Sequence, residues 1–119
     1  FAEMMDKYRD TDSTLDAIVK SHQRSVIDRD DELVHLYEIK DALVAKFGNE
    51  KGAKKKLNIP NGEWRVIGEL ANNQPLMQGR HRGKSVGALR AAQSSELEEA
   101  RKAATYLIEK YLIFLDKTR

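Results

Sequence analysis

Apolar residues recur every three or four positions along most of the chain, which is the spacing of one face of an α-helix. The segment from Asp30 to Phe47 shows this most clearly near the N-terminus, and its acidic start favours a helix beginning there. From Leu97 to Leu115 the apolar stripe continues for about five turns. Shorter stripes of the same period lie near residues 1–8, 15–26, 50–57 and 61–71.

Residues that favour helix ends stand next to these stripes. The candidate N-caps are Thr11, Asp12 or Ser13 for the second stripe, Asn61 for the stripe with Trp64, and a Ser95–Glu98 capping box for the last helix. Gly48 follows Phe47 and can end that helix in a left-handed conformation. The caps and the stripes therefore predict the same helices independently.

The pattern predicts an all-α fold. No stretch alternates apolar and polar residues, so we expect no sheet. We expect a bundle of about five helices, with the last helix and the Asp30–Phe47 helix at its centre and Trp64 in the core. Residues 72–93, rich in Gly, Asn and Pro, predict a long irregular loop before the last helix.

Length and composition exclude several classes of protein. The 119 residues are enough for one domain, which we place at residues 1–119, and a start at Phe1 suggests a piece of a longer chain. No run approaches the roughly 18 apolar residues of a spanning helix, and the start is not a signal peptide. The chain has no cysteine, which excludes disulfides and is compatible with the cytoplasm, where we place it. No nucleotide-binding or nucleophile-elbow motif is present, so we expect no cofactor. We also expect no metal and no membrane partner.

Charge is distributed unevenly along the chain. Residues 1–50 hold 7 basic and 12 acidic groups, and residues 51–95 hold 9 basic and 2 acidic groups. Residues 96–119 hold 5 of each, and the whole chain carries +2. The basic middle segment should attract anions such as a phosphate backbone or an acidic partner. The other interpretation is that it docks on the acidic half of its own chain or of a second chain.

Residues 53–71 resemble a helix-turn-helix. Asn58 stands at the turn position usually taken by glycine, and Ile59, Trp64 and Ile67 follow at packing positions. Lys54 stands where a small residue normally lets the two helices approach, and Arg65 alone offers an obvious contact to DNA. The alternative is a helical hairpin that only packs, with its three lysines as a solvated face.

The loop from Gln74 to Lys84 contains Arg-His-Arg at residues 80–82, between two glycines. Glycines let the backbone approach a ligand, and two guanidinium groups can grip a phosphate. The flanking arginines disfavour the charged form of His81, which leaves a neutral imidazole able to act as a base. The alternative is a basic loop without a defined ligand.

An irregular loop with Arg and His next to Gly, followed by a Glu-rich last helix striped with Leu and Tyr, resembles the HEPN domains over residues 65–119. These are small helical bundles found in ribonuclease toxins, defence systems and nucleotide-binding proteins. In catalytic members an Arg and a His a few residues apart act on RNA at a dimer interface. The resemblance implies a dimeric, metal-independent ribonuclease with His81 as base and Arg80 or Arg82 on the phosphate. No Arg stands four to six residues before His81, whereas Arg29 and His35, with five residues between them, have that separation at the start of a different helix.

These features favour a non-enzymatic nucleic-acid-binding domain, with RNA slightly preferred to DNA. The expected binding residues are Lys54, Lys55, Lys56, Arg65, Arg80, His81, Arg82, Lys84 and Arg90. The first alternative is the HEPN-like ribonuclease. The second is a protein-interaction or oligomerisation domain, in which the acidic first half of one chain pairs with the basic middle of another as a homodimer or with a different protein.

Overall fold

The described part of the protein is an all-α bundle of six α-helices, which confirms the predicted fold class with one helix more than the expected five. The computed structural model describes residues 2–74, 76–79 and 89–118, and no strand occurs in these ranges. The helices are α1 (Ala2–Arg9), α2 (Ser13–Ile27), α3 (Glu32–Phe47), α4 (Glu50–Leu57), α5 (Asn61–Gly68) and α6 (Ser94–Thr118). A 3₁₀ turn, Arg29–Asp31, precedes α3, and a π-helical turn, Glu69–Asn73, continues α5.

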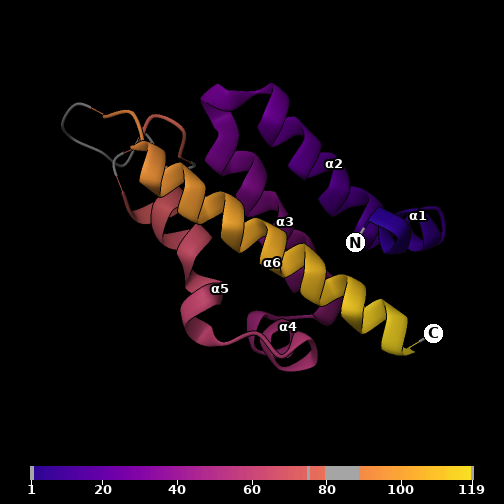
Figure 1. Ribbon diagram of the computed structural model, residues 1–119. Helices are drawn as coiled ribbons and strands as arrows, with labels where there is room; N and C mark the ends of the chain where they lie inside the picture. Colours follow the sequence, from indigo (N-terminus) through magenta and orange to yellow (C-terminus); the bar gives the residue numbers. More distant parts are fainter. Residues whose placement is uncertain (1, 75, 80–88, 119) are drawn as a thin grey trace.

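Helices α3 and α6 lie at the centre of the bundle, as predicted. Helix α3 contacts α2, α4, α5 and α6, and α6 runs the length of the molecule across the other helices (Figure 1). Their facing sides are fully buried at Leu36, Leu43, Leu107 and Tyr111. Trp64 of α5 is also fully buried, which confirms its predicted place in the core.

Two helix ends follow the predicted chemistry. Asp12 is the N-cap of α2: its side chain accepts the N–H of Leu15 at 2.8 Å. The same oxygen accepts the hydroxyl of Tyr111 in α6 at 2.8 Å. Gly48 ends α3 with φ of 89°, a left-handed conformation that glycine adopts without the strain of a Cβ. The cap of α2 therefore also fixes α2 against α6.

Two other predicted caps are wrong. Asn61 is the first residue of α5 rather than its cap, because Pro60 takes the N-cap position with an extended backbone. The Asn61 side chain instead accepts a hydrogen bond from Lys54 Nζ at 3.0 Å. The capping box at the start of α6 uses Glu96 in place of Glu98, and this carboxylate accepts the backbone N–H of Gln93 at 2.9 Å. Helix α6 therefore begins at Ser94, ahead of the predicted Ser95 cap.

The segment between α5 and α6 is irregular where the structure describes it, as predicted. Leu76 is almost fully buried and forms an isolated bridge with Arg90. The N–H of Met77 donates to the carbonyl of Arg90 at 2.9 Å. A Cβ on Gly79 would lie 2.8 Å from the carbonyl oxygen of Ala71, so this close approach requires glycine. These contacts fix both ends of the loop to the bundle.

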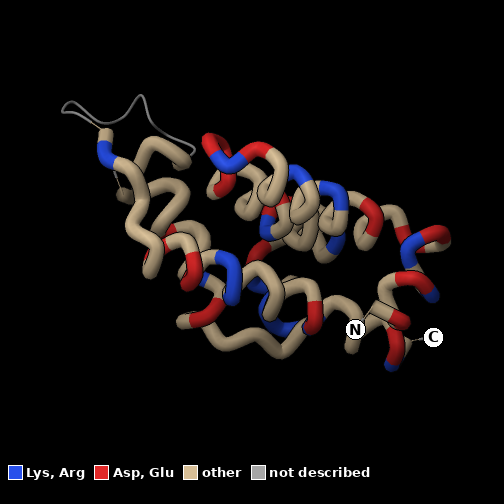
Figure 2. The backbone as a smooth tube through the Cα atoms, turned by 45° about the horizontal axis from the view of Figure 1, so that its top comes forward, with Lys and Arg blue, Asp and Glu red and all other residues tan. Residues whose placement is uncertain are grey.

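The two ends of the chain lie near each other (Figures 1 and 2). The Tyr8 hydroxyl donates to Asp116 at 2.7 Å, which joins α1 to the end of α6. Among the helices described, none has the length and apolar character needed to cross a bilayer.

Candidate nucleic-acid interface

Helix α4 is a short helix with defined ends. Asn49 caps its start, where its side chain accepts the N–H of Gly52 at 2.6 Å. Asn58 ends it in the left-handed conformation, with φ of 55° and ψ of 52°. This confirms the predicted role of Asn58 as the turn residue. Asparagine tolerates this conformation better than most side chains, because it is short and polar.

One side of α4 is anchored in the core and the other carries lysines. Ala53, Leu57 and the following Ile59 are buried. The last turn holds Lys54, Lys55 and Lys56, of which the first is half-buried and the other two are exposed. None of the three forms an ion pair with any residue that the structure describes. Their position at the C-terminal end suits the helix dipole, and the exposed Lys55 and Lys56 face solvent.

Helix α5 is held against α4 by a buried aromatic residue. Trp64 Nε1 donates to Glu50 Oε1 at 2.5 Å, and Ile67, three residues later, is also fully buried. Arg65 remains exposed. The turn at Asn58 and the Trp64–Glu50 hydrogen bond join the two helices, and each helix packs on α3 and α6.

Lys40 of α3 lies beside Trp64 of α5, and it is not among the site residues predicted from the sequence. It is only 8% exposed, and its ammonium lies 5.5 Å from the ring of Tyr37 and 5.1 Å from that of Trp64. Burial lowers the pKa of Lys40, and the nearby charges of Lys54 and Arg65 lower it further, against an opposing effect of Glu50. The sequence signal that could have identified Lys40 is its position on the apolar stripe of the predicted Asp30–Phe47 helix. These cations raise the local positive potential together.

Arg90, one of the predicted binding residues, is paired with a carboxylate. Its guanidinium makes a bidentate ion pair with Glu96, at 2.7 and 2.9 Å. Hydrogen bonds from Arg90 and from the backbone N–H of Gln93 lower the pKa of Glu96 to about 2. Arg90 therefore fixes the end of the loop to the start of α6, and the carboxylate offsets its charge.

Four of the predicted site residues, Arg80, His81, Arg82 and Lys84, lie outside the described residues. The last described residue before them, Gly79, lies against Ala71, and Leu76 pairs with Arg90 after them. The described residues on either side of residues 80–88 therefore lie close to the place where α5 meets α6.

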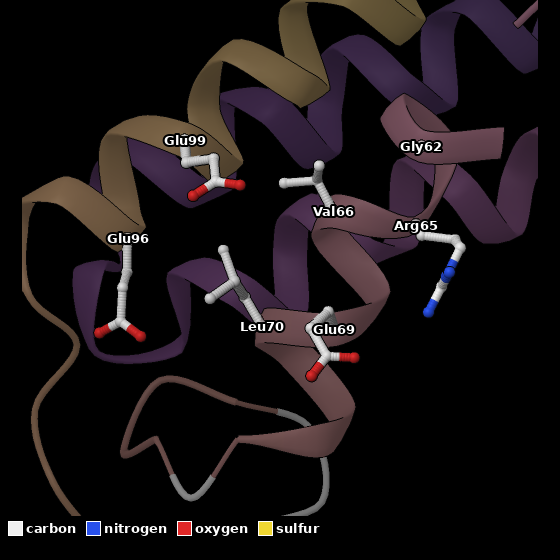
Figure 3. A pocket seen from close by; sticks show the side chains of 7 residues that line it. All are labelled: Gly62, Arg65, Val66, Glu69, Leu70, Glu96 and Glu99. Carbon is white, nitrogen blue, oxygen red and sulfur yellow. The ribbon is translucent and has the colours of Figure 1, made fainter. Parts of the chain in front are cut away.

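A hollow of about 470 Å³ lies at this junction, and it is acidic (Figure 3). It is lined by Gly62, Arg65, Val66, Glu69, Leu70, Glu96 and Glu99. Figure 3 shows Glu99 beside the apolar side chains of Val66 and Leu70, whereas Arg65 points away from α6. Three carboxylates around one hollow disfavour a phosphate there, so this hollow is not part of the candidate interface.

Several acidic residues of the first half of the sequence, Asp16, Asp28, Glu32 and Glu38, are paired within the bundle. Glu32 is only 1% exposed and binds Arg101 of α6 at 2.5 and 2.8 Å and Arg29 at 2.9 Å. Burial raises the pKa of Glu32, but these two guanidinium groups outweigh it and leave the pKa below its usual value. Figure 2 shows acidic and basic positions interspersed over much of the bundle.

Arg29 and His35, which have the Arg–His separation of the HEPN resemblance, are both engaged in local ion pairs. Arg29 binds Glu32, while His35 contacts Asp28 through Nε2 at 2.9 Å and Glu38 through Nδ1 at 3.2 Å. Burial lowers the pKa of His35, but the two carboxylates outweigh it and raise the pKa above its usual value. The contacts of the imidazole with these two carboxylates link the turn before α3 to the first turns of that helix.

Comparison with protein-family models, with curated proteins and with solved structures gives no match. Within the described ranges no three His, Asp or Glu side chains come together as they would around a metal ion.

Proposed function

We propose that this chain is a non-enzymatic nucleic-acid-binding domain that contacts the phosphate backbone through α4. One observation carries the proposal: the last turn of α4 presents three consecutive lysines without an ion-pair partner among the described residues. In contrast to these lysines, Arg29, Arg90 and Arg101 each form an ion pair with a carboxylate.

The anchoring of α4 supports this role. The buried side of the helix, the left-handed turn at Asn58 and the Trp64–Glu50 hydrogen bond hold the helix backbone in one place. Lysines on a fixed helix lose less conformational freedom on binding than lysines on a loose segment, because their backbone is already ordered. Lys40 and Arg65 add positive potential behind the lysines.

The surface of α5 favours RNA over sequence-specific reading of duplex DNA. A recognition helix in the major groove needs side chains that hydrogen-bond to base edges. Helix α5 exposes Glu63 and Arg65, and Glu69 follows it, while the Asn61 side chain is bound to Lys54. Two carboxylates on this surface would face phosphates, so the helix is poorly suited to enter the groove. Phosphate contacts from α4 require no such fit and suit single-stranded or folded RNA.

The proposal is tested by removing two exposed charges from α4. The variant Lys55→Gln/Lys56→Gln is compared with the wild-type protein by fluorescence anisotropy of a labelled single-stranded RNA, over a series of salt concentrations. Each phosphate contact on a single strand contributes about 0.7 to the slope of log K against log salt. We therefore expect the slope of the variant to be smaller in magnitude by about 1.4.

The matched control is Lys7→Gln/Lys117→Gln, which removes the same charge from exposed positions near the chain ends. This control should bind RNA with nearly the wild-type affinity and salt slope. Equal losses in both variants would mean that net charge alone governs binding. In that case α4 is not the interface and the proposal fails. Duplex DNA of the same length, measured in parallel, tests the preference for RNA.

A further inference from the structure

The outward side of α6 carries a stripe of exposed and half-buried residues. Its members lie three or four positions apart: Glu98, Lys102, Tyr106, Glu109 and Ile113. The opposite side of the helix, from Ala100 to Leu115, is buried in the core. Ile113 is 41% exposed and adds an apolar side chain to the stripe. A shallow hollow of about 330 Å³ lies along the stripe between Glu98 and Glu109.

The charges of this stripe, which we call the α6 face, are not committed within the bundle. Lys102 pairs with Glu98 at 3.5 Å, but the two side chains are 78% and 67% exposed. Such an exposed pair on one helix is weak and easily exchanged for another. Glu109 forms no ion pair with any residue in the described ranges. Arg101, one turn from Thr105, is by contrast held by the buried carboxylate of Glu32.

The order of charges on the α6 face is self-complementary. Lys102 and Glu109 lie at equal distances along the helix from a midpoint between Thr105 and Tyr106. When two copies of α6 pair antiparallel about a two-fold axis at this midpoint, Lys102 of each copy meets Glu109 of the other. A parallel pair would instead place lysine against lysine and glutamate against glutamate. The sign pattern therefore selects the antiparallel arrangement, in which both contacts are attractive.

The apolar groups of the stripe fit the same axis. Tyr106 is half-buried beside the midpoint, with the Lys110 ammonium 5.5 Å from its ring. In the antiparallel pair the two Tyr106 rings meet at the axis, and each Ile113 lies over the aliphatic part of Glu98 in the other copy. Tyrosine at the centre of a contact with charged residues around it is the usual composition of a protein interface.

We propose that the α6 face docks on a second copy of this chain, as an antiparallel helix pair with Tyr106 at the two-fold axis. This inference does not depend on nucleic-acid binding, because it uses a different helix and different residues. It also differs from pairing between the acidic half and the basic middle of two chains. In the α6 pair the same surface of each chain forms both sides of the interface.

Sedimentation equilibrium over a concentration series tests the proposal. We expect the average mass of the wild-type protein to rise from that of one chain towards that of two. Lys102→Glu and Glu109→Lys each place like charges at both contacts of the pair, and each should weaken the dimer at least about tenfold. An equimolar mixture of these two variants restores both attractive contacts. The mixture should therefore recover a dimer that neither variant forms alone.

The control is Lys46→Glu, which makes the same charge change as Lys102→Glu at an exposed position of α3 and should leave the dimer intact. Far-UV circular dichroism checks that each variant keeps its helices, and both altered α6 positions are exposed. The proposal is overturned if the wild-type protein remains a monomer at every concentration. It is also overturned if the single reversals leave the dimer unchanged, or if the mixture stays monomeric.

Discussion

Asp12 links two distant parts of the chain through one oxygen atom. Its Oδ1 accepts the N–H of Leu15, which caps α2, and the hydroxyl of Tyr111, which lies in α6. Both bonds are 2.8 Å long, and the Asp12 side chain is buried. Replacement of Asp12 by alanine removes a helix cap and a tertiary contact together.

The cost of Asp12→Ala follows from these two losses. An N-cap lost to alanine costs about 1 kcal/mol. Removal of a buried hydrogen-bond acceptor from the Tyr111 hydroxyl costs about 1–3 kcal/mol. The expected loss in the free energy of unfolding is therefore about 2–4 kcal/mol. Asp12→Asn keeps an acceptor oxygen in place and loses only the charge, so it should cost about 1 kcal/mol.

Urea unfolding measures these differences, with circular dichroism for the helices and Trp64 fluorescence for the core. The double variant Asp12→Ala/Tyr111→Phe should lose less stability than the two single variants added together, because the second change removes the donor that the first deprived of its acceptor. A loss below about 0.5 kcal/mol for Asp12→Ala, the level of an ordinary surface change, would refute the reasoning. So would an equal loss in Asp12→Asn.

Three further predictions concern pH and backbone conformation. His35→Gln should reduce the free energy of unfolding most below pH 6.5, which is the ordinary pKa of histidine. The reduction should become smaller as the pH rises through the raised pKa of His35 in the folded protein. Urea unfolding at several pH values measures this difference. Glu96→Gln should destabilise the protein above pH 4.5, and the difference should vanish as pH falls through the folded pKa of about 2, as followed by acid titration with circular dichroism. Gly48→Ala should cost about 1 kcal/mol because its φ is 89°, whereas Gly62→Ala, with no atom within 4 Å of the added Cβ, should cost nothing or stabilise; thermal unfolding compares the two.

The helices could be predicted because their signals are local. The apolar period sets which residues face the core, and Gly48 and Asn58 mark ends where the backbone turns left-handed. The two errors at Asn61 and at Ser95 arose where a tertiary contact decided which residue caps the helix. Asn61 accepts a bond from Lys54, and Glu96 replaces Glu98 because it also binds Arg90.

The candidate site was harder to predict, because a charge run does not show which charges are paired. Arg90 belongs to the basic segment of the sequence, yet it binds Glu96, six residues away. Glu32 and Arg101 are 69 residues apart and meet only in the folded bundle. In the sequence, Lys40 is a charged residue on an otherwise apolar stripe. Its place between the rings of Tyr37 and Trp64 depends on the packing of α3 against α5.

The most direct test of the central claim is the salt dependence of binding by the wild-type protein. Labelled single-stranded RNA and duplex DNA are titrated with protein at several salt concentrations, and the RNA is then run on a gel. Three phosphate contacts from α4 predict slopes of log K against log salt of about −2 for the RNA and about −3 for the DNA, with the RNA intact. Absence of binding, or binding that does not change with salt, would contradict the account. Cleaved RNA would contradict a non-enzymatic role and favour a ribonuclease that uses His81.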